Sequence, residues 1–185
     1  DLRKIHWPTS ARLDELQVRQ FRPPRHGRLS VVIDTRPTGE TTTAIDTTAS
    51  IAGSIAATVL KSGNATRIET TDGRSTPLVT GTASLDGLLE FLALLEGGSE
   101  RLNPAVPGSG GTVVVVSADP DVATNVATRR QLAARLRAAI VVTVDAASWG
   151  TATAEPYNGG DWIHLTGPGQ LAAHWGLGRR QATVR

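Results

Sequence analysis

The stretch that decides the fold is Leu29-Ser30-Val31-Val32-Ile33-Asp34-Thr35-Arg36-Pro37-Thr38-Gly39. A short run of mostly β-branched apolar residues ends in an aspartate, and a turn that contains proline and glycine follows at once. A segment with helical spacing comes next. This order predicts the first strand of a parallel α/β sheet, with Asp34 at its carboxyl end. Ligands bind at that edge of open α/β sheets. An aspartate in this place can also simply cap the turn, so both interpretations of Asp34 stay open.

The bulk composition narrows the class of protein. A chain of 185 residues fits one domain, or one domain with a short extension. Cysteine is absent, which excludes a disulfide framework, a thiolate metal site and a cysteine nucleophile. The chain has no methionine and opens on Asp1, so we expect a piece of a longer protein, with any membrane anchor upstream.

The charge is small overall but unevenly placed. The formal net charge is +2, and both ends of the chain are rich in arginine while the middle is acidic. Solvated arginine-rich faces explain such blocks. The chain lacks the interleaved aromatic residues on which single-stranded nucleic acid stacks, so we expect no nucleic-acid partner.

Strands and helices are predicted to alternate along the chain. Thr41 to Thr43 offer a cap for a helix that runs to about Lys61, and Gly63 suits the position after it. Its buried stripe is predicted to be Ile45, Thr48, Ala52, Ile55 and Val59. A strand at 67–71 follows, closed by an Asp72-Gly73 turn that leads into 77–79. Ser84 is predicted to cap a second helix that ends at 97–98, with one face formed by Leu85, Leu88, Leu89, Leu92 and Leu95.

The second half continues the alternation. The valine-rich run 112–117 predicts a strand buried on both faces. A helix is predicted after Asp119-Pro120-Asp121, then strands at 139–144 and 162–166, and a short helix at 171–175. The fold class is therefore α/β, a doubly wound, mostly parallel sheet with helices on both faces. We expect an N-terminal arm at 1–28, the domain at 29–178 and a basic tail at 179–185.

Candidate chemistry gathers where the strands end. Asp34, Asp119 and Asp145 each follow a predicted strand, and carboxylates with nearby threonine and serine hydroxyls suit a hard cation such as Mg²⁺. Those hydroxyls belong to Thr35, Thr38, Thr82 and Ser117. The alternative for Asp119 is an ordinary helix cap, since a proline follows it. The histidines, His6, His26, His164 and His174, form no metal motif, and no serine-hydrolase or phosphate-binding motif is present.

Two stretches together resemble a known family. The opening segment Asp1-Leu2-Arg3-Lys4-Ile5-His6-Trp7-Pro8-Thr9-Ser10-Ala11-Arg12, followed by a strand that ends in Asp34, is similar to the signature of the domain of unknown function 58 family. The signature positions are Asp1, Arg3, Ile5, His6, Trp7, Ala11 and Arg12. The resemblance implies a von Willebrand factor A-like, Rossmann-like domain with a metal-ion-dependent adhesion site at the carboxyl edge of its sheet. It also implies a membrane-associated parent chain, with this domain on the cytoplasmic side, and pairing with a MoxR-type AAA+ ATPase.

The adhesion-site pattern is changed in this chain. The family of adhesion domains has Asp-x-Ser-x-Ser, whereas this sequence has Asp34-Thr35-Arg36-Pro37-Thr38. Arginine stands where the first serine belongs, and a guanidinium beside Asp34 is able to occupy the position of the cation. The metal set left for Mg²⁺ or Mn²⁺ is Asp34, Thr38 and Asp119. The site is thus predicted to be degenerate, with no cofactor.

Two functions follow from these features. The first is a non-enzymatic scaffolding module that binds a protein partner through an edge formed by Asp34, Thr35, Arg36, Thr38 and Asp119, with no catalytic residue. The alternative is a divalent-metal-dependent hydrolase with Asp34 and Asp119 as ligands and His6 or His164 as the base.

Overall fold

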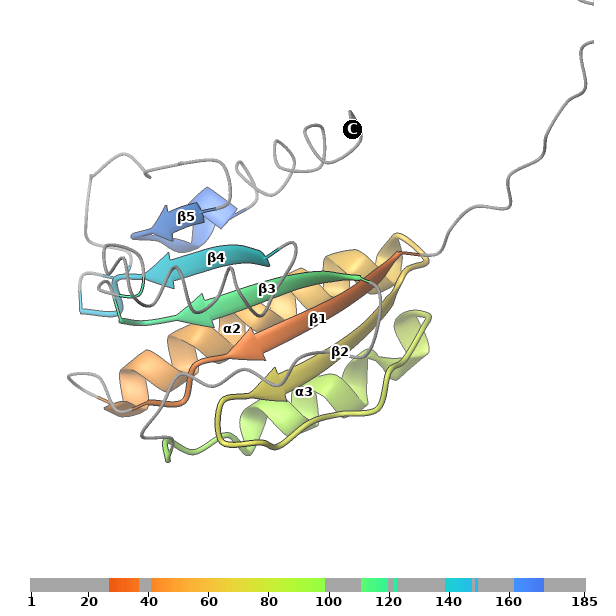
Figure 1. The fold of residues 1–185 in the computed structure, drawn as a ribbon, viewed down its shortest axis with the longest axis horizontal. Coiled ribbons are helices and arrows are strands. Elements are labelled where there is room, and N and C mark those ends of the chain that lie inside the picture. Colours follow the sequence, from red (N-terminus) through yellow and green to blue (C-terminus); the bar gives the residue numbers. More distant parts are fainter. Residues whose placement is uncertain are drawn as a thin grey trace, which may run out of the picture.

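The computed structural model contains a five-stranded sheet in the order β2-β1-β3-β4-β5, and every neighbouring pair is parallel (Figure 1). Its strands are β1 (Arg28–Ile33), β2 (Ala65–Thr70), β3 (Thr112–Ser117), β4 (Ala139–Val144) and β5 (Trp162–Leu165). The structure describes residues 27–36, 41–98, 111–119, 122, 139–147, 149 and 162–171. The predicted α/β class with a parallel sheet is confirmed, and the strands after β2 agree with their predicted ranges to within one residue.

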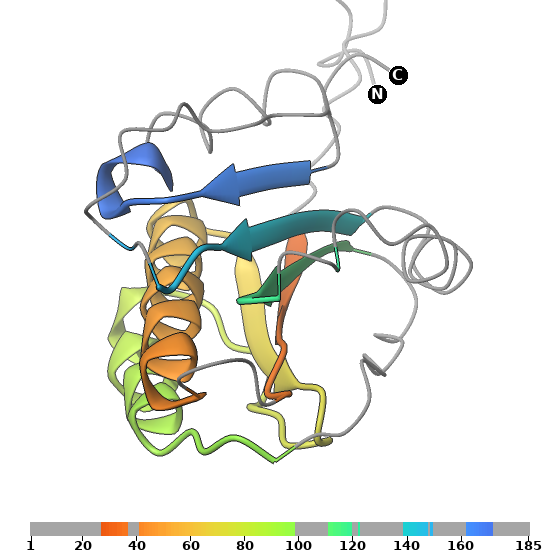
Figure 2. The same cartoon turned by 90° about the vertical axis from the view of Figure 1, so that its left-hand side faces the viewer.

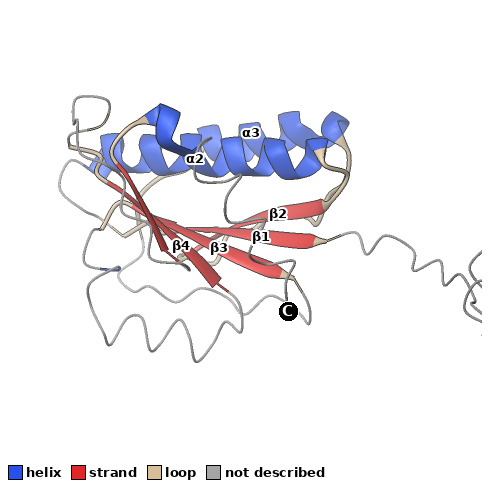
Figure 3. Ribbon diagram, turned by 90° about the horizontal axis from the view of Figure 1, so that it is seen from above, coloured by secondary structure: helices blue, strands red, loops and turns tan. Residues whose placement is uncertain are grey.

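Two helices lie side by side on one face of this sheet (Figures 2 and 3). They are α2 (Thr41–Lys61) and α3 (Leu85–Ala93), and the 3-10 turn η2 (Thr82–Ser84) leads into α3. The helix predicted to follow Asp119 lies outside the described residues, apart from helical Val122. Residues 168–171 are helical, earlier than the predicted 171–175, whose last four positions are not described.

The core lies on both sides of the sheet because successive strand residues point to opposite faces. On the α2 side, Val31 and Ile33 of β1 join Ile51 and Ile55 of α2 in the main apolar cluster. On the opposite side, Val32 joins a smaller cluster formed with Val113, Val115 and Val122. Burial on both faces explains why β1 and β3 are almost continuous runs of apolar residues.

Helix α2 forms as its pattern predicts. Its stripe packs on the sheet, and Lys61 occupies the last turn, where a positive charge suits the helix dipole. Gly63 follows with φ 74°, a left-handed conformation that ends the helix. The segment Thr43–Lys61 is long and apolar enough to cross a membrane by composition, but 61% of that window is buried inside the domain, as in the core helix of a globular fold.

Three details of the β2–α3 region differ from the prediction. Strand β2 covers Ala65–Thr70, two residues earlier than predicted at its start, while isolated antiparallel bridges Thr66–Val79 and Glu69–Ser75 confirm the return after the Asp72-Gly73 turn. Helix α3 ends at Ala93 instead of 97–98. Ser84 is its N-cap, but the hydroxyl donates to the Thr80 carbonyl and caps no helical N–H group.

The predicted leucine face of α3 is only partly correct. Leu88 and Leu92 are buried, whereas Leu89 is 45% exposed. One residue step turns a helix by about 100°, so when Leu88 and Leu92 point to the core, Leu89 lies at the edge of the buried stripe. Leu89 therefore borders the surface between α2 and α3.

Candidate functional site

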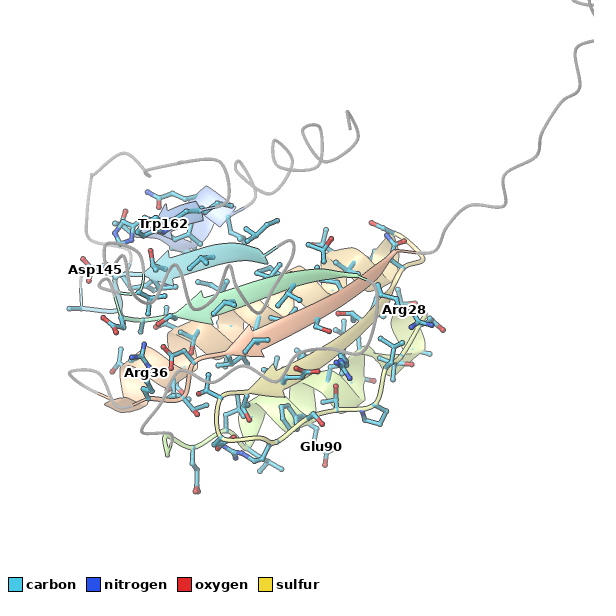
Figure 4. All side chains as sticks on the ribbon, in the orientation of Figure 1. Arg28, Arg36, Glu90, Asp145 and Trp162 are labelled. Carbon is cyan, nitrogen blue, oxygen red and sulfur yellow. The ribbon has the colours of Figure 1, made fainter. Side chains whose placement is uncertain are left out.

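The carboxyl end of the sheet gathers the acids that the sequence singled out. All strands point the same way, so β1 and β3 end together, with Ile33 opposite Val116 in register. Asp34 follows β1 directly, and its N–H group donates to the Val116 carbonyl (2.9 Å). Asp119 follows β3 by two residues. Figure 4 shows Arg36 and Asp145 at this end, and Arg28 at the other.

Two side-chain nitrogens of Arg36 donate hydrogen bonds to the Asp34 carboxylate. Its Nε donates to both oxygens (3.0 and 3.1 Å), and its Nη2 donates to Oδ2 (2.7 Å). The backbone N–H of Arg36 adds a bond to Asp34 Oδ1 (3.2 Å). Such a fork of parallel N–H groups is the strongest arrangement an arginine makes with a carboxylate. The turn after β1 therefore folds back onto its own aspartate.

The same guanidinium reaches the next strand. Arg36 Nη2 lies 3.0 Å from Asp119 Oδ2. Ser117 ties the cluster together, because its hydroxyl donates to Asp34 Oδ2 (2.6 Å) and accepts the N–H of Asp119 (3.1 Å). Asp34, Arg36, Ser117 and Asp119 thus form one hydrogen-bonded group, which we call the edge cluster.

Thr35 supports the edge cluster from below. Its side chain is fully buried, its N–H donates to the Thr71 hydroxyl (2.9 Å), and the two threonine hydroxyls are 3.0 Å apart. The Thr35 carbonyl accepts the N–H of Gly98 from the segment after α3 (3.0 Å). Thr35 therefore fixes the end of β1 against the end of β2 and presents no surface to a partner.

Burial and charge are graded across the cluster. The side chain of Asp34 is 1% exposed, whereas those of Arg36 and Asp119 are each 22% exposed. The hydrogen bond to Asp34 raises the pKa of Arg36, and both neighbouring carboxylates add to that effect. One guanidinium faces two carboxylates, so the cluster has one excess negative charge when all three groups are ionised. Asp119 and Arg36 are the members that solvent can reach.

A divalent cation does not fit the cluster as it stands. Both oxygens of Asp34 already accept hydrogen bonds from Arg36, and Oδ2 accepts a further one from Ser117. A metal ion would need those same lone pairs and would lie against a fixed positive charge. Within the described ranges, no group of three or more His, Asp or Glu residues is placed to hold a metal.

The predicted site residues are only partly brought together. Asp34, Arg36 and Asp119 meet as expected, and Ser117, one of the hydroxyl residues singled out as a candidate cation ligand, lies among them and links them by hydrogen bonds. Thr82 is exposed and lies at the opposite end of the sheet, just after Val79, which pairs with Thr66 near the start of β2. Thr38, the arm at 1–28 apart from Gly27 and Arg28, and the tail at 179–185 lie outside the described residues.

Of the two candidate hydrolase bases, the one that the structure describes, His164, does not contact the edge cluster. His164 Nδ1 lies 2.9 Å from the Thr143 hydroxyl, which also accepts the indole N–H of Trp162 (3.1 Å). Thr143 is opposite Ser117 in register, and His164 is opposite Thr143, so the imidazole lies two strands away from Ser117. His6 and His174 are outside the described part of the chain.

With this geometry in hand, comparison with known proteins identifies the family. The family model described as "Protein of unknown function DUF58" matches residues 1–145. The chain belongs to the DUF58 family. The match includes the signature arm, β1 and the complete edge cluster. No curated protein and no solved structure matches the chain.

Proposed function

We propose that this DUF58 chain is a non-enzymatic protein-interaction module, and that a protein partner binds at the edge cluster. The observation that supports this proposal is the arginine fork. The family resemblance implies a cation beside Asp34, and Arg36 donates two side-chain nitrogens to that carboxylate instead. The cluster is therefore preassembled without metal, and ordered charged groups at the end of a rigid sheet suit recognition of another surface.

The exposed atoms define how a partner reaches the cluster. Arg36 and Asp119 are each partly exposed, so a partner contacts a positive and a negative group side by side. Asp34 and Ser117 are buried and hold those two groups in place. A paired donor and acceptor of this kind select a partner by charge pattern more than by area.

The family resemblance suggests the context of this module. The order of the strands and the carboxyl-edge position of Asp34 are consistent with a von Willebrand factor A-like domain. On that basis we propose a membrane-associated parent chain, with this domain on the cytoplasmic side, and a MoxR-type AAA+ ATPase as the partner. The hydrolase alternative gains no support, because neither Asp34 nor Asp119 contacts a histidine among the described residues.

The test is a measurement of binding between the protein and a MoxR-type ATPase from the same genome, by biolayer interferometry with and without a chelator. We expect Arg36→Lys to weaken binding because lysine keeps the charge but loses the fork. We expect Asp119→Asn to weaken it as well, and the chelator to have no effect. The control is Arg28→Ala, at the opposite end of β1.

Unchanged affinity in both edge variants would contradict the proposed interface. Binding that disappears with the chelator would contradict the claim that Arg36 has replaced the cation. Circular dichroism of each variant separates a lost contact from a lost fold.

A further inference from the structure

The outer side of the helical layer contains a second surface that the edge cluster does not use. A groove of about 500 Å³ lies between α2 and α3, the two helices that lie side by side on one face of the sheet (Figure 3). It is lined by Asp46, Ala49, Ser50, Gly53, Ser54 and Ala57 of α2 and by Leu85, Leu89, Leu92 and Ala93 of α3. One wall therefore consists of small residues and the other mainly of leucines.

The shape of the groove matches a helix. The α2 residues that line it are spaced three or four apart from 46 to 57, so they form a straight stripe about 17 Å long at 1.5 Å per residue. Small side chains on such a stripe let another helix approach closely. A third helix of about three turns would lie between α2 and α3 as a ridge lies in a groove.

The leucine wall is incompletely covered. Leu89, which lines the groove, is 45% exposed. Leu92 is buried, because it also contacts the main core cluster. Covering Leu89 with an apolar side chain would remove its remaining surface from water, which favours binding.

One of the two serines that line the groove already has its hydroxyl paired. The Ser54 hydroxyl donates to the Ser50 carbonyl inside α2 (2.9 Å). A partner that covers Ser54 with apolar atoms therefore leaves that donor with its acceptor, and the usual penalty for burying a hydroxyl is reduced there.

Charge determines which helix fits. Asp46 lines the groove, and the exposed ionisable residues of α2 and α3 are Asp46, Asp86 and Glu90 against Lys61 alone, which lies beyond the lining at the end of α2. We propose that this groove binds an amphipathic helix of a partner protein, with a small-to-medium apolar face and lysine or arginine along its flanks. Asp46, the ionisable residue in the lining, attracts that helix and disfavours an acidic one.

The experiment uses side-chain-crosslinked helical peptides of about 12 residues as probes, a length taken from the stripe. One peptide has an alanine and leucine face flanked by lysines, and the other has the same face flanked by glutamates. Fluorescence anisotropy measures binding of each to the whole protein. We expect the basic peptide alone to bind, and added salt to weaken it.

Matched variants locate the binding. Leu89→Ser should weaken the basic peptide about tenfold, since the bound leucine surface is lost. Leu78→Ser is the control, because Leu78 is equally exposed at 44% but lies outside the groove. Asp46→Lys should reduce binding of the basic peptide and allow the acidic one to bind.

Several outcomes would overturn the inference. They are failure of the basic peptide to bind, equal binding of both peptides, or equal effects of Leu89→Ser and Leu78→Ser. Sedimentation of the protein alone gives a further check, because self-association abolished by Leu89→Ser would assign the groove to a second copy of this chain instead. The edge variants at Arg36 and Asp119 should leave peptide binding unchanged, which separates this surface from the proposed edge interface.

Discussion

Arg36 Nη2 lies 2.7 Å from Asp34 Oδ2 and 3.0 Å from Asp119 Oδ2, so one guanidinium joins carboxylates that follow two neighbouring strands. This bridge ties the ends of β1 and β3 together at the edge where parallel α/β sheets bind ligands. The guanidinium therefore links the ends of two strands and offsets the charge of their carboxylates.

Removing the bridge should destabilise the fold. Arg36→Ala leaves the Asp34 carboxylate buried without its cation, and we expect a loss of about 2–4 kcal/mol in the free energy of unfolding, reduced from the fully buried case because Arg36 is partly exposed. Arg36→Lys should lose less, since the charge remains. Urea denaturation measures both variants against Arg28→Ala, an exposed control on the same strand. A loss no larger than that of the control would show that the bridge adds no stability.

Metal binding should appear only when the guanidinium is removed. We expect calorimetric titration of Mn²⁺ or Mg²⁺ to give no heat of binding with the native chain. Arg36→Ser should gain affinity, because it frees the oxygens of Asp34 and supplies a hydroxyl ligand. Asp34→Asn in the same background should abolish the gain. Binding to the native chain that Asp34→Asn removes would mean that the cation competes successfully with Arg36.

Ser117 should matter more than its size suggests. Its hydroxyl is fully buried, donates to Asp34 and accepts the N–H of Asp119. Ser117→Ala removes the hydroxyl that accepts the Asp119 N–H and takes one hydrogen bond from Asp34 Oδ2, to which Arg36 still donates, and we expect a loss of about 1–3 kcal/mol in unfolding free energy. The control is Ser54→Ala, whose exposed hydroxyl bonds only within α2 and whose removal should cause no loss. Equal losses in unfolding free energy for the two substitutions would contradict the role of Ser117 in stabilising the edge cluster.

The sheet was predictable because a strand that is buried on both faces consists of a continuous run of apolar residues. Strand β3 illustrates this: residues 113–116 are all valine, and a strand covered on both faces favours such a run between turn residues. The meeting of Asp34 with Asp119 followed from the same logic, since parallel strands end at one edge. The expectation that Arg36 lies beside Asp34 came from the resemblance to the adhesion-site pattern, in which Arg36 takes the position of the first serine.

The positions of other residues could not be predicted from a local sequence pattern. Ser117 was predicted only as a hydroxyl near a cation, and its role as the link between Asp34 and Asp119 depends on the register of β3 against β1, which the sequence does not encode locally. Leu89 was assigned to the core because leucine at helical spacing is usually buried, but a stripe can be wider than the face that packs. Thr82 was grouped with the site by residue type alone. The chain returns along β2 before it reaches Thr82, so this residue lies at the opposite end of the sheet from the edge cluster.

Glu69 should make stability depend on pH. The residue is 3% exposed, its Oε1 pairs with Arg67, and its Oε2 has no hydrogen-bond partner. Burial raises the pKa of Glu69, while Arg67 opposes the shift. Because the pKa of Glu69 is higher in the folded chain than in the unfolded chain, its carboxyl group contributes fully to the free energy of unfolding only at a pH below the unfolded pKa. That contribution is lost as the pH rises through the pKa of the folded state.

Glu69→Gln removes this titration. We expect the variant to gain stability relative to the native chain as the pH rises from about 4 toward neutrality, the range that begins at the usual glutamate pKa. Urea denaturation at several pH values gives the comparison, and Glu90→Gln, on the exposed side of α3, is the control. A difference between Glu69→Gln and the native chain that stays constant with pH would show that Glu69 keeps an ordinary pKa in the fold.

Gly111 should be intolerant of any side chain. It has φ 141°, a conformation that disfavours L residues, and a Cβ atom there would lie 2.8 Å from the carbonyl oxygen of Arg28. Gly111→Ala must therefore move the start of β3 away from β1, and we expect a loss of about 2 kcal/mol or more. Gly87→Ala is the matched control, because Gly87 lies in α3 with open space around it and alanine there should add up to about 1 kcal/mol. Thermal unfolding of the two variants should shift in opposite directions. A shift in the same direction would mean that the β1–β3 junction relaxes at little cost, and that the register which brings Ser117 to Asp34 does not depend on this close approach.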